Sequence, residues 1–285
     1  MRIGIVGAEN SHSAAIARTL NVRKAIRGAS VDFLWGETDA FAQAAAEKGA
    51  IPTIVKSPRQ MLGKIDALIV DHRHARHHLR AALPFLKAGI PVFVDKPFCY
   101  RSAEGKSFLA LARRTKTPVT SFSTVPLQRS FLSLRKKIGK LGPLAGGATF
   151  GHCDLRSPYG GVFFYGVHQV EMACEIFGYN VAAVQIVRNA ACSTGQLLYG
   201  SGAIVSLHFF HRERPPFALT AVGSRGTVHG KIESDADPYE AGIRAFTAMF
   251  RTGREPRPHS DILQTVRILE ALERSAKSRR KEKVA

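Results

Sequence analysis

Acidic residues are scarce in this sequence, since 22 Asp and Glu stand against 41 Lys and Arg and give a formal net charge of +19. Cysteine is scarce as well, and no two of the four cysteines form a CxxC pair, which argues against a structural zinc site and a disulfide framework. No apolar run approaches the roughly 20 residues that a membrane helix needs. These absences predict a cytoplasmic protein without a membrane segment.

The positive charge favours encounter with anions such as nucleic acid, phosphorylated cofactors or acidic metabolites. It is spread along the chain, and its densest block, residues 277–283, suggests a frayed basic tail from about residue 276. No basic stretch is interleaved with aromatic residues, as a base-stacking surface requires. We therefore interpret the charge mainly as a solvated basic surface. Nucleic acid, whose binding would fall steeply with salt, is a disfavoured partner.

Short apolar runs alternate with helical periods over the first 120 residues. This alternation predicts strand–helix repeats and a doubly wound parallel sheet with right-handed crossovers. The chain enters the strand pattern at residue 3, so we expect no signal peptide. The predicted strands are residues 3–6, 31–35, 66–70, 92–94 and 119–122.

Strands dominate from about residue 145 onward, with glycine-rich turn signals between them. Two helices, near 167–177 and 261–275, show apolar residues at helical spacing. We predict an α/β fold with two domains: residues 1–120 form the parallel sheet, and residues 121–285 form an α+β domain with a mostly antiparallel open sheet. The predicted strands of the second domain are residues 147–151, 181–187, 196–199, 203–210 and 218–222.

Three segments in a fixed order carry a family resemblance. Residues 66–97 end in Asp95-Lys96-Pro97, residues 160–171 contain Gly-Gly and Gly-Val-His, and residues 246–256 end in Gly-Arg-Glu-Pro. Their order and spacing resemble those of the Gfo/Idh/MocA family of nicotinamide-dependent oxidoreductases, such as glucose-fructose oxidoreductase and inositol dehydrogenase. The resemblance covers nearly the whole chain.

This resemblance implies a Rossmann dinucleotide-binding domain over residues 1–120, with a substrate and oligomerisation domain after it. It implies an NAD(P)-dependent oxidoreductase that moves a hydride between nicotinamide and a hydroxyl-bearing carbon of a sugar, a cyclitol or a related small molecule. It also implies a homodimer or homotetramer that associates through the sheet of the second domain.

Two residues are the predicted catalytic groups. Lys96 matches the family lysine that lies beside the nicotinamide and touches the substrate hydroxyl; a buried lysine loses its proton more easily. His168 matches the general base that accepts the hydroxyl proton, a task that suits imidazole. The alternatives are a lysine that only extends from a strand end and a histidine bonded to a backbone carbonyl. Tyr165 is expected to enter the substrate pocket.

One position departs from the family pattern beside this histidine. The family places an aspartate four residues before it, and this chain has Phe164 there. A base without an orienting carboxylate is weaker. Glu171, one helical turn after His168, is a candidate substitute. A regulatory homologue that keeps the fold without turnover is therefore an alternative function, followed by a lyase or hydrolase in which bound NAD shuttles a hydride transiently.

The predicted phosphate loop also departs from the GxGxxG pattern. It reads Gly7-Ala8-Glu9-Asn10-Ser11-His12, with Glu9 and His12 where glycines are usual. Asn10 and Ser11 can still present donors at a helix N-terminus, where anions are favoured. Glu37 follows the second strand, where an acid receives ribose hydroxyls and repels a 2′-phosphate. We therefore predict NAD or NADP as cofactor, with NAD slightly favoured.

Residues 71–78 lie where the family contacts the nicotinamide half of the cofactor. Asp71, His72, His74 and His77 are predicted cofactor contacts in this stretch, together with Asp95 and Lys96. We interpret the stretch as a basic loop around an anionic ligand. A divalent metal on Asp71, His72 and His74 is a minor alternative, since histidine and carboxylate are common ligands, and we predict no metal.

Overall fold

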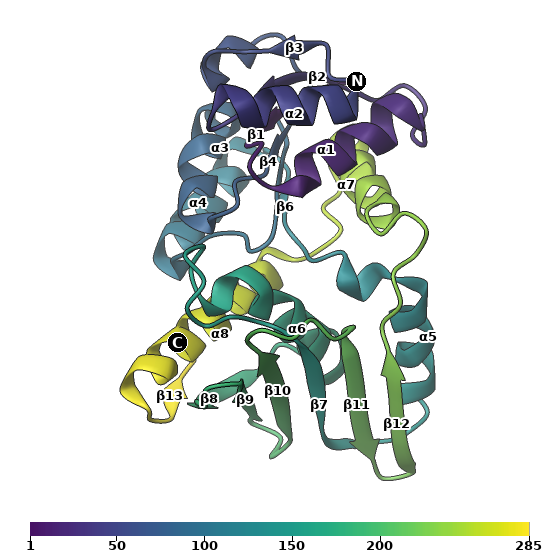
Figure 1. Ribbon diagram of the computed structural model, residues 1–285, viewed down its shortest axis with the longest axis vertical. Coiled ribbons are helices and arrows are strands. Elements are labelled where there is room, and N and C mark those ends of the chain that lie inside the picture. Colours follow the sequence, from purple (N-terminus) through teal and green to yellow (C-terminus); the bar gives the residue numbers. More distant parts are fainter. Residues whose placement is uncertain (285) are drawn as a thin grey trace. The chain divides into compact units, whose positions relative to one another are not determined.

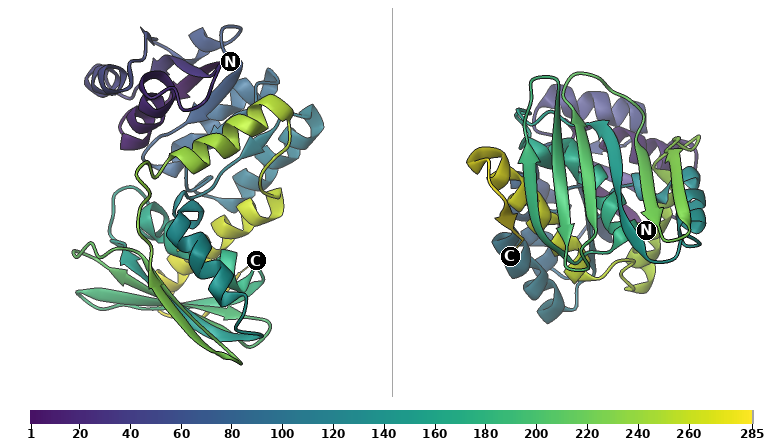
Figure 2. Two further views of the ribbon diagram at one scale, coloured as in Figure 1. Left: turned by 90° about the vertical axis from the view of Figure 1, so that its right-hand side faces the viewer. Right: turned by 90° about the horizontal axis from the view of Figure 1, so that it is seen from below.

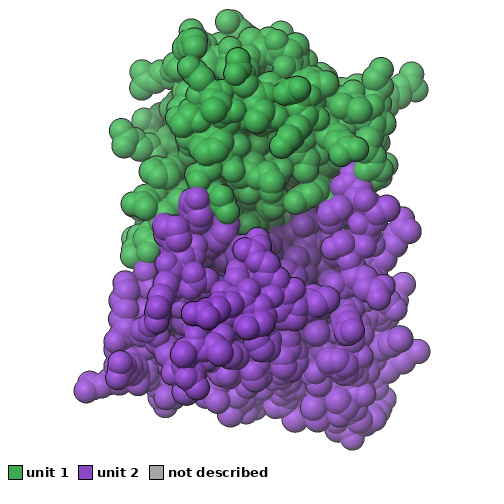
Figure 3. Space-filling model, viewed as in Figure 1, with its two compact units in different colours: residues 1–122, 239–262 green, residues 123–238, 263–285 purple. Residues whose placement is uncertain are grey.

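The computed structural model describes residues 1–284 and contains two compact units (Figure 3). Unit 1 consists of residues 1–122 and 239–262, and unit 2 consists of residues 123–238 with the segment that starts at Leu263. The predicted division after residue 120 lies close to the first crossing between the units. It does not include the return of residues 239–262 to unit 1.

Unit 1 is built on a six-stranded sheet whose strand pairs are all parallel (Figure 1). Its strand order is β3-β2-β1-β4-β5-β6, so the strands that follow β1 are added first on one side of it and, from β4 on, on the other side. The point between β1 and β4, where the order switches, is where ligands bind in such sheets. The predicted Rossmann sheet is confirmed. The strands are β1 (Arg2–Val6), β2 (Ser30–Trp35), β3 (Thr53–Ile54), β4 (Ala67–Val70), β5 (Val92–Val94) and β6 (Val119–Thr120).

The helices of unit 1 follow local signals in the sequence. In α2 the side chain of Thr38 accepts a hydrogen bond from the N–H of Phe41, which caps the first turn. Helix α3 continues through Pro84 to Lys87. The helices are α1 (Ser11–Ala17), the π-helical turn η1 (Arg18–Val22), α2 (Asp39–Gly49), the 3₁₀ turns η2 (Pro58–Met61) and η3 (Ala75–His77), α3 (His78–Lys87), α4 (Ser102–Thr115) and α7 (Glu240–Thr252).

Aromatic packing explains why residues 239–262 belong to unit 1. The ring of Phe246 in α7 stacks on Phe93 of β5 with 4.4 Å between centroids, and both side chains are buried. After α7, the carboxylate of Glu255 accepts a hydrogen bond from the N–H of Val119 in β6 at 2.9 Å. The returning segment thus covers the sheet and completes the hydrogen bonding of its last strand.

Unit 2 contains a seven-stranded sheet in the order β12-β11-β7-β10-β9-β8-β13. All pairs are antiparallel except β7 with β10, so the predicted mostly antiparallel sheet is confirmed as a mixed one. Figure 2 shows the sheet with its helices on one face. The strands are β7 (Leu144–His152), β8 (Val181–Val187), β9 (Cys192–Tyr199), β10 (Ile204–Phe210), β11 (Ala218–Gly223), β12 (Gly226–Lys231) and β13 (Glu282–Lys283).

Alternating side chains divide this sheet into a core face and an open face. In β10 every second residue is buried, while Ile204 at its start is 48% exposed. Phe131 and Leu134 of α5 and Met172 of α6 pack with Leu219 of β11 in the core. The helices of this unit are η4 (Val125–Leu127), α5 (Arg129–Ile138), α6 (Val162–Phe177) and most of α8 (His259–Ser278).

Residues 276–284 complete α8 and form strand β13, so the predicted frayed tail from about residue 276 is not found in the described residues. Strand β13 pairs with β8, and the hydroxyl of Ser275 donates to the carbonyl of Arg280 at 2.6 Å. Arg274 forms an ion pair with Glu282 at 3.5 Å. A short reverse turn after α8 therefore adds an edge strand, which charge density alone did not indicate.

Across residues 1–284, none of the helices is both long and apolar enough to traverse a bilayer. All four cysteines are free thiols. The cytoplasmic location stays a prediction.

Candidate functional site

The loop after β1 is held tightly against the end of β4. Gly7 has φ +114°, and a Cβ on it would lie 2.6 Å from the carbonyl carbon of Asp71. The N–H of Gly7 donates to the carbonyl of Trp35 at 2.9 Å, and the N–H of Asp71 donates to the carbonyl of Val6 at 2.8 Å. Only glycine combines this conformation with this close approach.

Glu37 binds the predicted phosphate loop directly. Its Oε2 accepts hydrogen bonds from the backbone N–H groups of Ala8 at 2.8 Å and Glu9 at 2.9 Å. Its Oε1 is buried and has no hydrogen-bond partner among the described residues. A buried acceptor without a donor is costly, and the two hydroxyls of a ribose are donors of the kind that this oxygen lacks. This end of the loop therefore fits the adenosine half of a dinucleotide.

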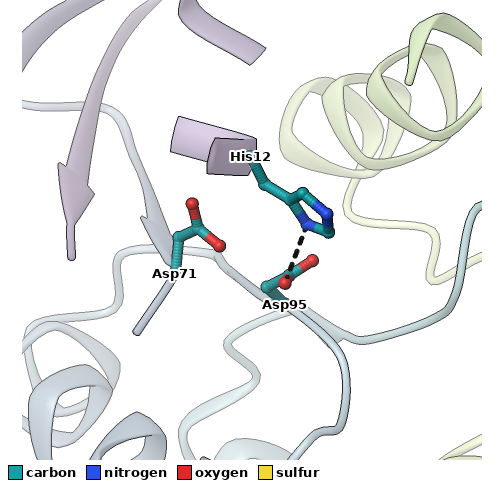
Figure 4. Close-up of side chains that lie close together, drawn as sticks. All are labelled: His12, Asp71 and Asp95. Carbon is teal, nitrogen blue, oxygen red and sulfur yellow. Dashed lines mark hydrogen bonds and ion pairs between the residues drawn. The ribbon is translucent and has the colours of Figure 1, made fainter. Parts of the chain in front are cut away.

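Four polar side chains meet where the loop crosses the ends of β4 and β5, and Figure 4 shows three of them, His12, Asp71 and Asp95. The amide of Asn10 donates to Asp71 Oδ1 at 2.7 Å and to Asp95 Oδ2 at 3.1 Å. The Nδ1 of His12 lies 3.0 Å from the same Asp95 oxygen. Asn10 occupies the N-cap position of α1 but makes no side-chain cap there, because its amide is used on the two carboxylates.

Burial and charge separate the two carboxyl groups. Burial, and after it the negative charge of Asp95, raise the pKa of Asp71 well above its usual range, against the smaller effects of Lys96 and Asn10. Burial also acts to raise the pKa of Asp95, but the His12 ring and Lys96 together hold it below its usual range. The pair therefore combines one carboxylate with one carboxyl group that resists ionisation.

Lys96 follows Asp95 at the end of β5 and is only 7% exposed. Its peptide bond to Pro97 is cis. Its charge acts on Asp71 as well as on Asp95. The structure thus places the predicted catalytic lysine at the carboxyl edge of the sheet, beside the two acids.

The histidines of the 71–78 stretch form a row of rings rather than one ligand group. The His72 ring lies 5.6 Å from the His77 ring and 5.9 Å from Trp35, measured between centroids. Burial, followed by neighbouring positive groups, lowers the pKa of His72 to about 3 and that of His74 to about 4. Both are therefore neutral at pH 7 and add no positive charge to this loop.

His78 was not singled out from the sequence, yet it fixes this stretch. Its Nε2 lies 2.8 Å from the carbonyl of His72, and its Nδ1 lies 2.9 Å from the carbonyl of Pro97. Burial lowers its pKa, and the two carbonyls oppose that effect. The ring thereby ties the start of α3 to the segment that carries Lys96.

In unit 2, helix α6 holds His168, and a serine from the preceding loop meets it. The Oγ of Ser123 lies 2.7 Å from His168 Nδ1, and both side chains are buried. The backbone N–H of Ser123 donates to Glu171 Oε2 at 2.9 Å, and its Oγ accepts from the N–H of Val125 at 3.1 Å. Glu171, the candidate substitute for the missing carboxylate, therefore holds the backbone of the serine that contacts the histidine.

Aromatic rings occupy the neighbourhood of the missing carboxylate. Phe164 lies 5.0 Å from Tyr159 and 4.9 Å from Tyr165, and Tyr165 lies 5.8 Å from His168, between centroids. Tyr165 and His168, the two predicted substrate contacts of this helix, are thus neighbours. Sequence reasoning missed Ser123; the available signal was its position directly after the last predicted strand of the first domain.

The first 122 residues match a known protein family, described as an oxidoreductase family with an NAD-binding Rossmann fold, GFO_IDH_MocA. These residues are thus similar to the Gfo/Idh/MocA oxidoreductase family. The matched residues contain the whole parallel sheet of unit 1, and the matching family is described by an NAD-binding Rossmann fold.

Relatives of known sequence or structure extend this comparison. The uncharacterized oxidoreductase YhhX of Escherichia coli K12 is 28% identical over 203 residues, which cover 62% of this chain and 56% of that protein. The match therefore spans little more than half the length of this curated relative. The solved structure of myo-inositol dehydrogenase from Lactobacillus casei, in complex with NAD(H) and myo-inositol, has a TM-score of 0.85 at 15% identity and covers 100% of this chain and 97% of its own. GenD2 from gentamicin A biosynthesis, in complex with NAD, has a TM-score of 0.87 at 15% identity, with 100% of this chain and 96% of its own covered. These structures share the fold of this chain along its length.

Acid should destabilise the protein through His74. The unfolded chain takes up the proton near pH 6.5, whereas the folded protein takes it up only near pH 4. Stability should therefore fall as the pH drops through this window, with about 1–2 kcal/mol lost through His74 at pH 5. The His74→Asn variant keeps an acceptor for the N–H of Arg76 and should lose less stability on acidification. Urea unfolding at pH 7.5 and pH 5 measures this, and equal pH dependence in both proteins would contradict it.

Proposed function

We propose that this protein is an NAD-dependent oxidoreductase that moves a hydride between nicotinamide and a hydroxyl-bearing carbon of a sugar, a cyclitol or a related small molecule. The observation that carries the proposal is the buried Lys96 at the carboxyl edge of an NAD-binding Rossmann sheet. Ligands bind at this edge of open parallel sheets. The Lactobacillus casei dehydrogenase, whose fold this chain shares and which binds myo-inositol, supports the class of substrate.

The cofactor would be held by the 7–12 loop and by Glu37. The buried Oε1 of Glu37 would accept a ribose hydroxyl, and the first N–H groups of α1 would face the pyrophosphate. A 2′-phosphate would meet the Glu37 carboxylate, which is why we propose NAD over NADP.

The chemistry divides between the cofactor and two side chains. A nicotinamide, when bound, accepts or gives up the hydride. Lys96 would donate a hydrogen bond to the substrate oxygen and so stabilise developing negative charge. His168 would take the hydroxyl proton at Nε2 during oxidation and return it during reduction.

Ser123 would position the base in place of the family aspartate. Its hydroxyl can accept the Nδ1–H of His168, which leaves the Nε2 lone pair for the proton. A hydroxyl carries no charge, so it stabilises the imidazolium less than a carboxylate does. Ser123 is thus a positioning residue that gives a working but weaker base.

The predicted homodimer or homotetramer belongs to this proposal. Ile204, which is 48% exposed at the start of β10, and the stacked rings of Phe150 and His208 lie on the open face of the unit 2 sheet, which would form the interface. Sedimentation velocity should show a dimer or tetramer that Ile204→Lys weakens. A monomeric wild-type protein at micromolar concentration would contradict the association.

The cofactor proposal is tested with the single tryptophan, which lies beside His72 at the end of β2. Titration with NADH should quench Trp35 in a saturable way that persists at moderate salt, and NADPH should bind more weakly. The variant Glu37→Ser should bring the affinities for NADH and NADPH closer together, because the Glu37 carboxylate no longer repels the 2′-phosphate. A folded protein that binds neither nucleotide would overturn the cofactor assignment.

The catalytic proposal is tested by turnover in a screen of polyols and sugars. Lys96→Ala and His168→Ala should abolish turnover. Ser123→Ala should lower kcat by about 10- to 100-fold, with KM little changed and the pH–rate profile displaced, while Ser123→Thr keeps most of the rate. Ser201→Ala, an exposed serine in the β9–β10 turn, is the matched control. Unchanged turnover in both Lys96→Ala and His168→Ala would remove these residues from the mechanism.

A further inference from the structure

The cluster of Asn10, His12, Asp71 and Asp95 has features that cofactor contacts alone do not explain. One ligand atom each of His12, Asp71 and Asp95 lies within 4.8 Å of the others, and no other group of three or more such side chains occurs in residues 1–284 (Figure 4). The three come from different elements: His12 from α1, Asp71 from the end of β4, and Asp95 from the end of β5. The minor metal alternative of Asp71, His72 and His74 does not form such a group.

An unpartnered oxygen points to a missing ligand. Asp71 is fully buried, its Oδ1 accepts from Asn10, and its Oδ2 has no hydrogen-bond donor among the described residues. Because Asp71 resists ionisation, this oxygen carries a proton when no cation is bound, and a buried carboxylate oxygen with neither would be costly. A cation at the centre of the group would displace that proton, contact this oxygen and offset the charges of the two acids.

The spacing and the ligand types suit a divalent metal. Two ligand atoms at about 2.1 Å from an ion and at right angles lie about 3 Å apart, and His12 Nδ1 and Asp95 Oδ2 are 3.0 Å apart. Two carboxylates with one imidazole form a mixed oxygen and nitrogen set, which suits Mn²⁺ and Zn²⁺. The side chain of His12 is 17% exposed and that of Asp95 is 6% exposed, so the group is enclosed on most sides.

We propose that His12, Asp71 and Asp95 bind a divalent transition-metal ion, with Asn10 as a supporting contact to both carboxylates. The inference stands apart from the proposed hydride transfer, because metal binding needs neither nucleotide nor substrate. It also gives a reason for a histidine at the third glycine position of the loop, since a glycine there would remove the nitrogen ligand.

The test uses the full-length protein without nucleotide and Mn²⁺ as the probe, followed by electron paramagnetic resonance. The wild type should bind Mn²⁺ saturably at one site per chain, and Zn²⁺ should displace it, as its higher place in the affinity order requires. Asp71→Asn and His12→Gln should each weaken binding at least about tenfold. Asp39→Asn, which removes an exposed carboxylate that pairs with Lys56 at 3.7 Å, is the control and should bind like the wild type.

Three results would overturn the proposal. The first is no saturable Mn²⁺ binding by the wild type, which would indicate that a proton shared by the two acids satisfies the cluster. The second is undiminished binding by Asp71→Asn and His12→Gln, and the third is an equal loss in Asp39→Asn, which would indicate surface binding. Circular dichroism confirms that each variant is folded, and Asp95→Asn replaces any variant that is not. Because no nucleotide is present, these outcomes are independent of the NADH titration.

Discussion

The burial of two acidic side chains at one edge of the unit 1 sheet is the constraint on which the predicted cofactor site depends. β4 and β5 are adjacent and parallel, so the residues that follow them, Asp71 and Asp95, must meet. Buried carboxyl groups need donors or cations close by. The loop after β1 supplies them through Asn10 and His12, and Gly7 lets that loop approach closely enough. The loop departs from the usual glycine pattern at His12, and this residue, like its neighbour Asn10, contacts the buried acids.

Around His168, too, a departure from the family pattern is accompanied by a new contact. The position four residues earlier carries Phe164, whose ring joins neighbouring aromatic rings. The contact to the imidazole is made by Ser123, from a loop that Glu171 holds in place. Under the proposed function, this hydroxyl would orient the imidazole as a carboxylate does but would add no negative charge to its surroundings. Proton transfer would then still be possible, with a smaller driving force.

The sequence predicted those features that depend on neighbours along the chain. Strand periodicity predicted the parallel sheet, and the family resemblance singled out Asp71, Asp95 and Lys96, which directly follow two of its strands. It did not predict the contact of Ser123 with His168, because residues 45 positions apart are brought together only by packing. Strand β13 was missed for a similar reason. The basic segment around it resembles a solvated tail, and only its pairing with β8, nearly 100 residues earlier in the chain, makes it a strand. The return of α7 to unit 1 likewise rests on a ring stack that periodicity does not encode.

The net charge of +19 acts on approaching anions at long range, whereas the carboxyl groups at the proposed cofactor-binding edge act on them only at contact. A strongly basic surface raises the rate at which any anion meets the protein, and salt screens this effect. Under the proposed function, selection would occur at contact, where the carboxylate of Glu37 accepts hydrogen bonds from two amides of the loop. That carboxylate would disfavour an additional phosphate group and favour hydroxyl donors. Composition alone therefore suggests a general affinity for anions, whereas the proposed role of Glu37 would restrict which of them bind.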